Sequence, residues 1–273
     1  MLKTRIYTVL VLLPLFVAAL FYLPEAAWAL FVAPLAMIGA WEWGGLAGWP
    51  RAGRMMYAGA IAAGGVLQWQ YGYGDAHDVR VVAAVILGIS LLFWVVFVPL
   101  WLAKGWHMRS MPILAVTGAI LLLPLWFALV QMHAQPRLLL MLMAIVWVSD
   151  TAAYFCGRRW GRHKLAVSIS PGKTWEGVCG ALVAVAGYYW LFNAADVADH
   201  AVLQGATGFA GFMVLAVLGI EGDLFESWIK RTAGVKDSGT IFPGHGGVLD
   251  RIDALTASMP AAALIMLFSG MAA

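Results

Sequence analysis

The sequence predicts an all-α integral membrane protein with about nine transmembrane helices. Of its 273 residues, 63% are hydrophobic, and Lys, Arg, Asp and Glu together make up only 11%, against about 25% in soluble proteins. The mean hydropathy is +0.84. A water-soluble fold of this length needs more polar surface than these few charged residues supply. Lipid is therefore the predicted solvent for most of the chain. The composition also excludes a disordered chain, a coiled coil and a nucleic-acid-binding protein.

Apolar runs of about 20 residues are long enough to cross the hydrocarbon core as helices. We expect such spans at 7–23, 26–46, 55–69, 81–102, 111–132, 138–155, 175–192, 203–225 and 248–271. The first run is long for the apolar part of a signal peptide, which favours a retained helix. We expect one membrane domain, 1–273, in which 1–140 supplies N-terminal helices and 141–273 holds the polar helix ends and long loops.

The distribution of positive charge predicts the orientation of these spans. An odd number of spans places the two termini on opposite sides of the membrane. If the N-terminus is cytoplasmic, every Lys and Arg except Arg80 and Arg137 falls in a cytoplasmic segment, as the positive-inside rule requires. We therefore expect a cytoplasmic N-terminus and an outer C-terminus. Two of the cytoplasmic connections, 157–174 and 226–247, are long and polar.

Two carboxylates lie within or beside the apolar runs, where an ionisable group is costly unless it is paired or functional. Glu42 lies between two tryptophans near the cytoplasmic end of its span; an interfacial anchor and a functional group both remain open. Asp150 follows more than two helical turns of apolar residues. A carboxylate is a poor choice for helix packing, so a functional role is favoured there.

The connection before span 175–192 contains the segment Ser-Pro-Gly-Lys-Thr at 170–174. Lys173, Thr174 and the backbone N–H groups at the start of the next helix suit a phosphate, since a helix N-terminus carries partial positive charge. Positive-inside charge alone explains the preceding arginines better than it explains this cluster. The segment is not a Walker A motif, because the pattern Gly-x-x-x-x-Gly-Lys is missing.

The densest polar cluster spans 221–253. Asp223 and Ser227 are four residues apart and share a helix face, and Asp250 and Asp253 are three apart on the next helix. Carboxylates in this arrangement suit Mg²⁺, which shares its coordination with water and phosphate oxygens. Basic residues that can neutralise phosphates lie in the same cluster, at Lys230, Arg231, Lys236 and Arg251. The alternative is a charged interfacial loop with internal salt bridges.

His245 lies in the glycine-rich part of this cluster. A zinc site is rejected there, because no second His or Cys stands at ligand spacing. A general base and a hydrogen-bond donor to phosphate both remain open for this side chain.

This cluster looks like the full signature of the phosphatidate cytidylyltransferase family, also called CDP-diacylglycerol synthases. The similar segments are Ser-Trp-Ile-Lys-Arg at 227–231, Lys-Asp-Ser-Gly at 236–239 and Phe-Pro-Gly-His-Gly-Gly-Val-Leu-Asp-Arg-Ile-Asp at 242–253. The segments 149–154 and 170–177 are similar to further family motifs, and Glu42-Trp43 to a weaker one. Gly172 stands where the family pattern has Lys or Asn. The first 140 residues match only as generic membrane helices.

The resemblance implies the reaction of CTP with phosphatidate to give CDP-diacylglycerol and pyrophosphate, with Mg²⁺ and with a second cation left open. It also implies a homodimer in the bacterial inner membrane with its active site facing the cytoplasm. The expected metal ligands are Asp223, Asp250 and Asp253. The other expected catalytic residues are Lys230, Arg231, Lys236, Asp237, His245 and Arg251. The expected substrate-binding residues are Asp150, Ser170, Lys173, Thr174, Glu176, Ser227, Gly246 and Gly247.

Three other functions are alternatives to this one. A CTP-dependent polyprenol kinase is another membrane enzyme that uses CTP. A CDP-alcohol phosphotransferase would carry an Asp-Gly-x-x-Ala-Arg pattern, which this sequence lacks. An ion or phosphate transporter would spread its acidic residues along a pathway, whereas the acids here cluster at one face.

Overall fold

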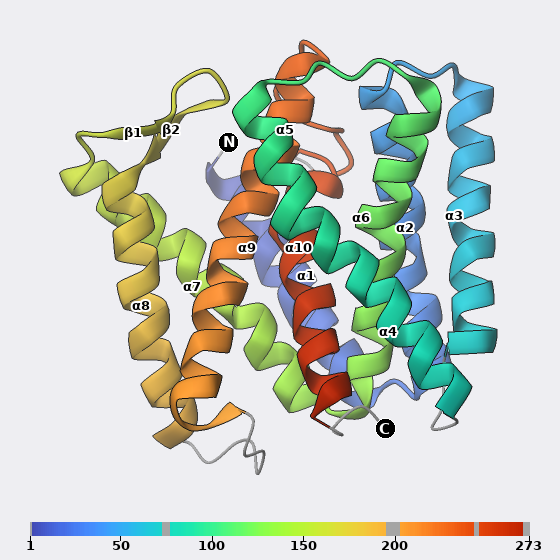
Figure 1. The fold of residues 1–273 in the computed structure, drawn as a ribbon, viewed down its shortest axis with the longest axis horizontal. Helices are drawn as coiled ribbons and strands as arrows, with labels where there is room; N and C mark the ends of the chain where they lie inside the picture. Colours follow the sequence, from blue (N-terminus) through green and yellow to red (C-terminus); the bar gives the residue numbers. More distant parts are fainter. Residues whose placement is uncertain (1, 73–76, 195–202, 243–245, 270–273) are drawn as a thin grey trace.

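The computed structural model describes residues 2–72, 77–194, 203–242 and 246–269, which form a bundle of long helices (Figure 1). The helices are α1 (Leu2–Tyr22), α2 (Glu25–Leu46), α3 (Arg51–Gly72), α4 (His77–Leu92), α5 (Val98–Lys104), α6 (Met111–Gln131), α7 (Pro136–Trp160), α8 (Trp175–Ala194), α9 (Gly205–Thr232) and α10 (Leu249–Phe268). A π-helical turn, Phe93–Phe97, joins α4 to α5, and a 3-10 turn, Met132–Ala134, extends α6. The all-α prediction is confirmed.

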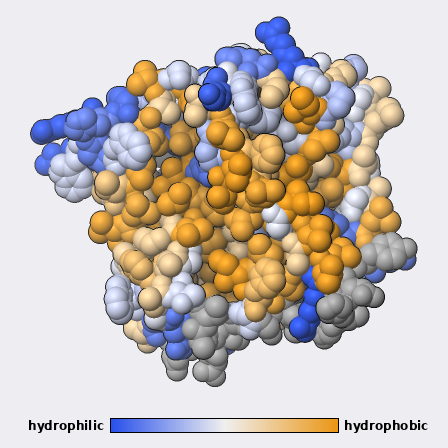
Figure 2. All heavy atoms as spheres, in the orientation of Figure 1, coloured by the Kyte–Doolittle hydropathy of each residue, from blue (hydrophilic) through white to orange (hydrophobic). Residues whose placement is uncertain are grey.

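Seven helices in the described part of the chain are long and apolar enough to cross a membrane. They are α2, the continuous rod of α4 and α5, α6, α7, α8, α9 and α10. The apolar part of α1 is shorter, and α3 is not among the seven. Figure 2 shows hydrophobic side chains in a band across the middle of the molecule, with hydrophilic ones toward its two ends. The integral membrane character is confirmed, while the count of nine spans and the orientation of the termini stay predictions.

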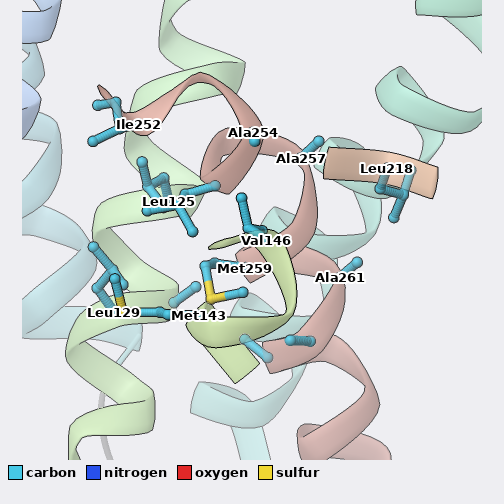
Figure 3. Close-up of a cluster of buried hydrophobic side chains, with 14 of the residues drawn as sticks. Leu125, Leu129, Met143, Val146, Leu218, Ile252, Ala254, Ala257, Met259 and Ala261 are labelled. Carbon is cyan, nitrogen blue, oxygen red and sulfur yellow. The ribbon is translucent and has the colours of Figure 1, made fainter. Parts of the chain in front are cut away.

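Helix α10 lies at the centre of the bundle. Of the residues in its most apolar 18-residue stretch, 78% are buried. Its side chains pack with those of α6, α7 and α9 in the core drawn in Figure 3. Small residues on α10 let neighbouring helices approach closely, which is how membrane helices gain packing energy; these include Ala254, Ala257 and Ala261.

Buried tryptophans tie the helices together through their indole N–H groups. An indole has one donor, which needs an acceptor in an apolar interior. Trp43 on α2 donates to the carbonyl of Leu114 on α6 at 2.8 Å. Trp94, in the π-helical turn, donates to the carbonyl of Thr256 on α10 at 3.1 Å. The first bond joins two of the N-terminal helices, and the second fixes the N-terminal half of the bundle to α10, which carries part of the polar cluster.

The connections from α2 to α3, α5 to α6, α7 to α8 and α9 to α10 all lie at the upper end of the bundle in Figure 1. One of them holds a short antiparallel hairpin of β1 (Lys164–Ala166) and β2 (Ser170–Thr174), in which Lys164 lies opposite Thr174. The hairpin stands where the sequence predicts only a loop. Most of the lysines and arginines predicted to be cytoplasmic lie in these connections or in the helix turns next to them, so the structure gathers them at one end.

Candidate active site

A cavity of about 760 Å³ lies where α7, the hairpin, α8, α9 and α10 meet. This volume is in the range of small-molecule sites, about 300–1,000 Å³. Among the described residues that line it, seven are basic: Arg158, Lys164, Lys173, Lys230, Arg231, Lys236 and Arg251. Five are acidic: Asp150, Asp223, Asp237, Asp250 and Asp253. So many basic side chains in one cavity favour a multiply charged anion as the ligand.

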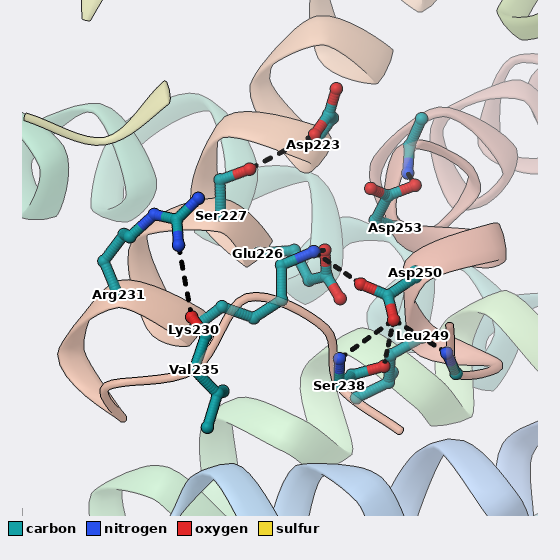
Figure 4. Close-up of polar contacts among 12 residues, drawn as sticks. Asp223, Glu226, Ser227, Lys230, Arg231, Val235, Ser238, Leu249, Asp250 and Asp253 are labelled. Carbon is teal, nitrogen blue, oxygen red and sulfur yellow. Dashed lines mark hydrogen bonds and ion pairs between the residues drawn. The ribbon is translucent and has the colours of Figure 1, made fainter. Parts of the chain in front are cut away.

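The C-terminal turns of α9 supply one wall of this cavity. Asp223, Ser227 and Lys230 follow one another at helical spacing on the cavity side. The Oγ of Ser227 lies 3.4 Å from the Oδ1 of Asp223. The ammonium of Lys230 is buried, and it pairs with Glu226 and, at 2.6 Å, with the Oδ1 of Asp250 on α10. Lys230 therefore links α9 to the start of α10 (Figure 4).

Asp250 is held by donors on both of its carboxylate oxygens. The Oδ1 accepts from Lys230. The Oδ2 accepts from the backbone N–H of Ser238 at 2.9 Å, the hydroxyl of Ser238 at 2.9 Å and the backbone N–H of Gly247 at 2.8 Å. Gly246 has a φ of +82°, which a residue with a side chain rarely adopts. This arrangement fastens the loop before α10 to the first turn of that helix.

The hairpin supplies the opposite wall. Lys173 on β2 pairs with the Oδ2 of Asp223 at 2.7 Å. Thr174 caps α8, because its Oγ1 accepts from the backbone N–H of Gly177 at 3.1 Å; its own hydroxyl proton can still be donated to an anion. Arg231 at the end of α9 donates to the carbonyl of Ile169 at 3.3 Å, which holds the hairpin turn against α9.

A close contact between α9 and α10 brings Asp223 and Asp253 to the same cavity. A Cβ atom on Gly222 would lie 2.6 Å from the carbonyl oxygen of Asp253 and 3.1 Å from the Cα of Ala254. Only glycine allows this approach of the two backbones. Asp223 and Asp253 are near enough to interact electrostatically, and the carboxylate of Asp253 accepts from the N–H of Ala254 at 2.8 Å.

The expected metal ligands do not form one cluster in the described part of the chain. No group of three or more His, Cys, Asp or Glu side chains there lies close enough together to hold a metal ion. Both oxygens of Asp250 are already occupied, by Lys230 on one side and by Ser238 and Gly247 on the other. Two carboxylates are nevertheless enough for Mg²⁺ when phosphates and water complete its coordination. Asp223 and Asp253, both lining the cavity, provide such a pair.

The cavity brings together most of the residues that the sequence singled out. Those lining it are Asp150, Ser170, Lys173, Thr174, Asp223, Ser227, Lys230, Arg231, Lys236, Asp237, Asp250, Arg251 and Asp253. Glu176 lies outside it and accepts from the backbone N–H and the ring Nδ1 of His163, at 3.2 and 2.6 Å. Gly246 and Gly247 belong to the loop that surrounds Asp250. His245 lies outside the described residues.

Several residues at or behind the cavity were not expected there. Arg158, whose charge the positive-inside rule explains, lines it together with Lys164, for which the sequence predicts no site role. Tyr154 lies beside Arg158, whose guanidinium donates to the Tyr154 hydroxyl at 3.0 Å. Ser238 lies in the signature segment 236–239, where the sequence predicts no role for it, and its hydroxyl donates to Asp250. Its position between an acidic and a glycine residue was the available signal, since such hydroxyls often serve neighbouring backbone or carboxylate groups.

Comparison with known proteins agrees with this geometry. Residues 3–269 match the model of the Cytidylyltransferase family. A phosphatidate cytidylyltransferase of Pseudomonas aeruginosa is 37% identical over 281 residues, covering 99% of this chain and 98% of that protein. One of Haemophilus influenzae is 33% identical over 95% of this chain and 96% of its own length. The resemblance stated from the motifs is confirmed, and the chain belongs to the cytidylyltransferase family, whose members are nucleotidyltransferases.

Proposed function

We propose that this chain is an integral membrane phosphatidate cytidylyltransferase, which converts CTP and phosphatidate into CDP-diacylglycerol and pyrophosphate. The observation that carries the proposal is the cavity, which gathers basic and acidic side chains at one end of an apolar bundle. A nucleotide can reach such a site from water while the lipid keeps its acyl chains in the bilayer. The names of the two relatives that match over almost the whole chain support the same activity.

The proposed reaction is a direct displacement at the α-phosphorus of CTP. A phosphate oxygen of phosphatidate forms the new P–O bond. The bond from the α-phosphorus to the oxygen that bridges to the β-phosphate breaks, and pyrophosphate leaves with that electron pair. The attacking phosphate is already an anion, so little base catalysis is needed. Positioning and charge neutralisation then supply most of the rate enhancement.

The residues that line the cavity are assigned roles by their chemistry and position. The basic groups at the ends of α9 and α10 neutralise the phosphates: Lys230, Arg231, Lys236 and Arg251. On the other wall, Lys173 with the hydroxyls of Ser170 and Thr174 binds a phosphate of the nucleotide or of the lipid. Asp150, Asp237 and Ser227 are positioned for further substrate contacts. Glu176, Gly246 and Gly247 are assigned to holding the surrounding backbone.

We assign Asp223 and Asp253 to Mg²⁺, and Asp250 to holding Lys230 and the loop. The sequence predicts Asp250 as a third metal ligand. We leave it out because its oxygens already accept from four donors. When bound, Mg²⁺ would neutralise negative charge on the phosphates and on the leaving pyrophosphate. Asp223 would exchange its partner Lys173 for the cation, which frees that lysine for a phosphate.

The proposed location is the bacterial inner membrane, with the cavity facing the cytoplasm. The cavity lies at the end of the bundle where most lysines and arginines gather, and positive charge favours the cytoplasmic side. CTP is a cytoplasmic nucleotide, so this orientation also gives the substrate access. We further propose a homodimer, which the mass of the purified protein in detergent would test.

The decisive experiment uses CTP labelled at either the α- or the γ-phosphate, with phosphatidate in detergent micelles. A cytidylyltransferase transfers the α-label into lipid and releases the γ-label as pyrophosphate. A polyprenol kinase would instead transfer the γ-label to a polyprenol. Absence of α-labelled lipid from the folded protein in the presence of Mg²⁺ would reject the proposed function, and a transporter would leave both labels in CTP.

A further inference from the structure

A buried carboxylate from the N-terminal half of the chain holds the loop beside the cavity. Glu42 lies near the end of α2 and is only 2% exposed. Its Oε1 accepts from the backbone N–H of Val248 at 3.1 Å, and its Oε2 accepts from the N–H of Leu249 at 2.9 Å. The Oε2 also lies 3.0 Å from the hydroxyl of Ser238. All three partners belong to the connection between α9 and α10 or to the first residue of α10.

The position of Glu42 explains how its charge is tolerated. The donors at Val248 and Leu249 are among the N–H groups at the start of α10, which have no partner within that helix. These groups carry partial positive charge, so a carboxylate is stabilised there. A residue of α2 thus caps α10. Glu42 and Leu249 are 207 positions apart in the sequence.

The loop wraps closely around this carboxylate. A Cβ atom on Gly239 would collide with the Oε1 of Glu42. A Cβ atom on Gly247 would collide with both carboxylate oxygens of Glu42 and with the hydroxyl of Ser238. Glycine at these two positions is therefore required by the close approach of the backbone to Glu42. Because the backbone of the loop packs directly against this carboxylate, a substitution of Glu42 is expected to shift the loop.

Ser238 connects Glu42 to the cavity. Its hydroxyl lies 3.0 Å from the Oε2 of Glu42 and 2.9 Å from the Oδ2 of Asp250. A hydroxyl has one proton to donate, so the two carboxylates share it. Asp250 in turn pairs with Lys230, which lines the cavity. A continuous chain of polar contacts therefore runs from Glu42 through Ser238 and Asp250 to Lys230, while Glu42 itself does not line the cavity.

We propose that Glu42 is a positioning residue for the cytidylyltransferase reaction, which sets the orientation of Asp250 and Lys230 through Ser238 and the start of α10. This inference rests on the proposed function. Glu42 touches neither substrate. Its role gives the N-terminal helices a specific part in forming the active site.

The test compares Glu42→Gln, Ser238→Ala and the double variant with the unchanged protein. Glutamine keeps the shape of Glu42 but has one acceptor oxygen, so it cannot accept from both the α10 N–H groups and Ser238 in the same way. We expect kcat per folded molecule to fall at least tenfold in Glu42→Gln, with a smaller change in the KM for CTP, since Lys230 is displaced from its best position and not removed. Ser238→Ala should lower kcat in the same direction.

The double variant separates positioning from simple stabilisation. If Glu42 acts through Ser238, the loss of kcat in the double variant will be no larger than in Glu42→Gln alone. Losses that multiply would overturn the proposed route. A lower Tm with kcat per folded molecule within twofold of the unchanged protein, in both single variants, would overturn the positioning role itself. If Glu42→Gln does not fold, Ser238→Ala decides the question, because it leaves the cap of α10 in place.

Glu25→Gln is the matched control, because Glu25 is an exposed residue at the other end of the same helix. It should leave kcat and KM unchanged. The unchanged protein and this control also separate the test of the proposed function from the test of the positioning role. Failure of both to make CDP-diacylglycerol would reject the proposed function, whereas activity in both, together with normal kcat in Glu42→Gln and Ser238→Ala, would reject only the positioning role.

Discussion

Asn in place of Asp250 should lower stability as well as activity, which distinguishes this residue from Asp253. The carboxylate of Asp250 accepts from Lys230 on one oxygen and from Ser238 and Gly247 on the other. Asparagine has one acceptor oxygen and one NH₂ donor. Whichever way the amide turns, a donor faces either the ammonium of Lys230 or the N–H groups of the loop.

The structure gives the size of this effect. A hydrogen bond to a charged group contributes about 1.5–3 kcal/mol, and removing one partner of a buried ion pair costs about 3–5 kcal/mol. Lys230 keeps its second partner, Glu226, so we expect the free energy of unfolding to fall by about 2–3 kcal/mol. For a chain of this length that lowers the Tm by roughly 4–12 °C. Asp253→Asn should change the Tm little, since its amide can still accept from the N–H of Ala254.

The assay measures thermal unfolding and CDP-diacylglycerol formation on the same detergent-purified samples. Both variants should lose activity by orders of magnitude, but only Asp250→Asn should lose stability. Asp253→Asn should also need more Mg²⁺ for its residual activity, because it removes a proposed ligand. A normal Tm for Asp250→Asn, or a larger loss of Tm for Asp253→Asn, would refute the division of roles between the two aspartates.

Three further predictions concern other parts of the molecule. Lys173→Ala should raise the KM for CTP or phosphatidate at least tenfold in steady-state assays, whereas Arg159→Ala, which alters a basic residue outside the lining of the cavity, should not. Gly222→Ala should push α10 away from α9, and activity measurements should show a large loss even where size-exclusion behaviour is normal. Reporter fusions after Gly172 should report cytoplasm and fusions after Gln135 the outer side; the reverse result would overturn the orientation.

Hydropathy alone predicted most of the helices, because an apolar run long enough to span the bilayer has few alternatives to a helix. The ends of the helices were harder to predict. The eighth span was expected to end at 225, yet α9 continues to Thr232. Glu226 and Lys230 form an ion pair one turn apart on this polar extension of the helix. The hairpin is not predictable from the sequence because its strands are short and β2 contains proline and glycine, which are poor strand formers.

The members of the site were predictable from the sequence, but their partners were not. Helical spacing placed Asp250 and Asp253 near one face. It could not show that backbone N–H groups of Ser238 and Gly247 would direct one of the two carboxylates into the loop. The role of Glu42 was left open for the same reason, since its partners lie about 200 residues away and only the tertiary fold brings them together.

The ion pair between Lys173 and Asp223 leads to a last prediction about how the ligands bind. A charge in a partly buried site is costly without a partner. Here the ammonium of Lys173 lies 2.7 Å from the Oδ2 of Asp223, so each group neutralises the other. A cation on Asp223 releases Lys173 for a phosphate, so Mg²⁺ and CTP should each strengthen the binding of the other, as linkage requires. Lys173→Ala removes the competitor of the cation, so it should bind Mg²⁺ more tightly in the absence of nucleotide while it binds CTP more weakly. Isothermal titration measures both affinities, and weaker binding of Mg²⁺ alone to Lys173→Ala would contradict the exchange of partners at Asp223.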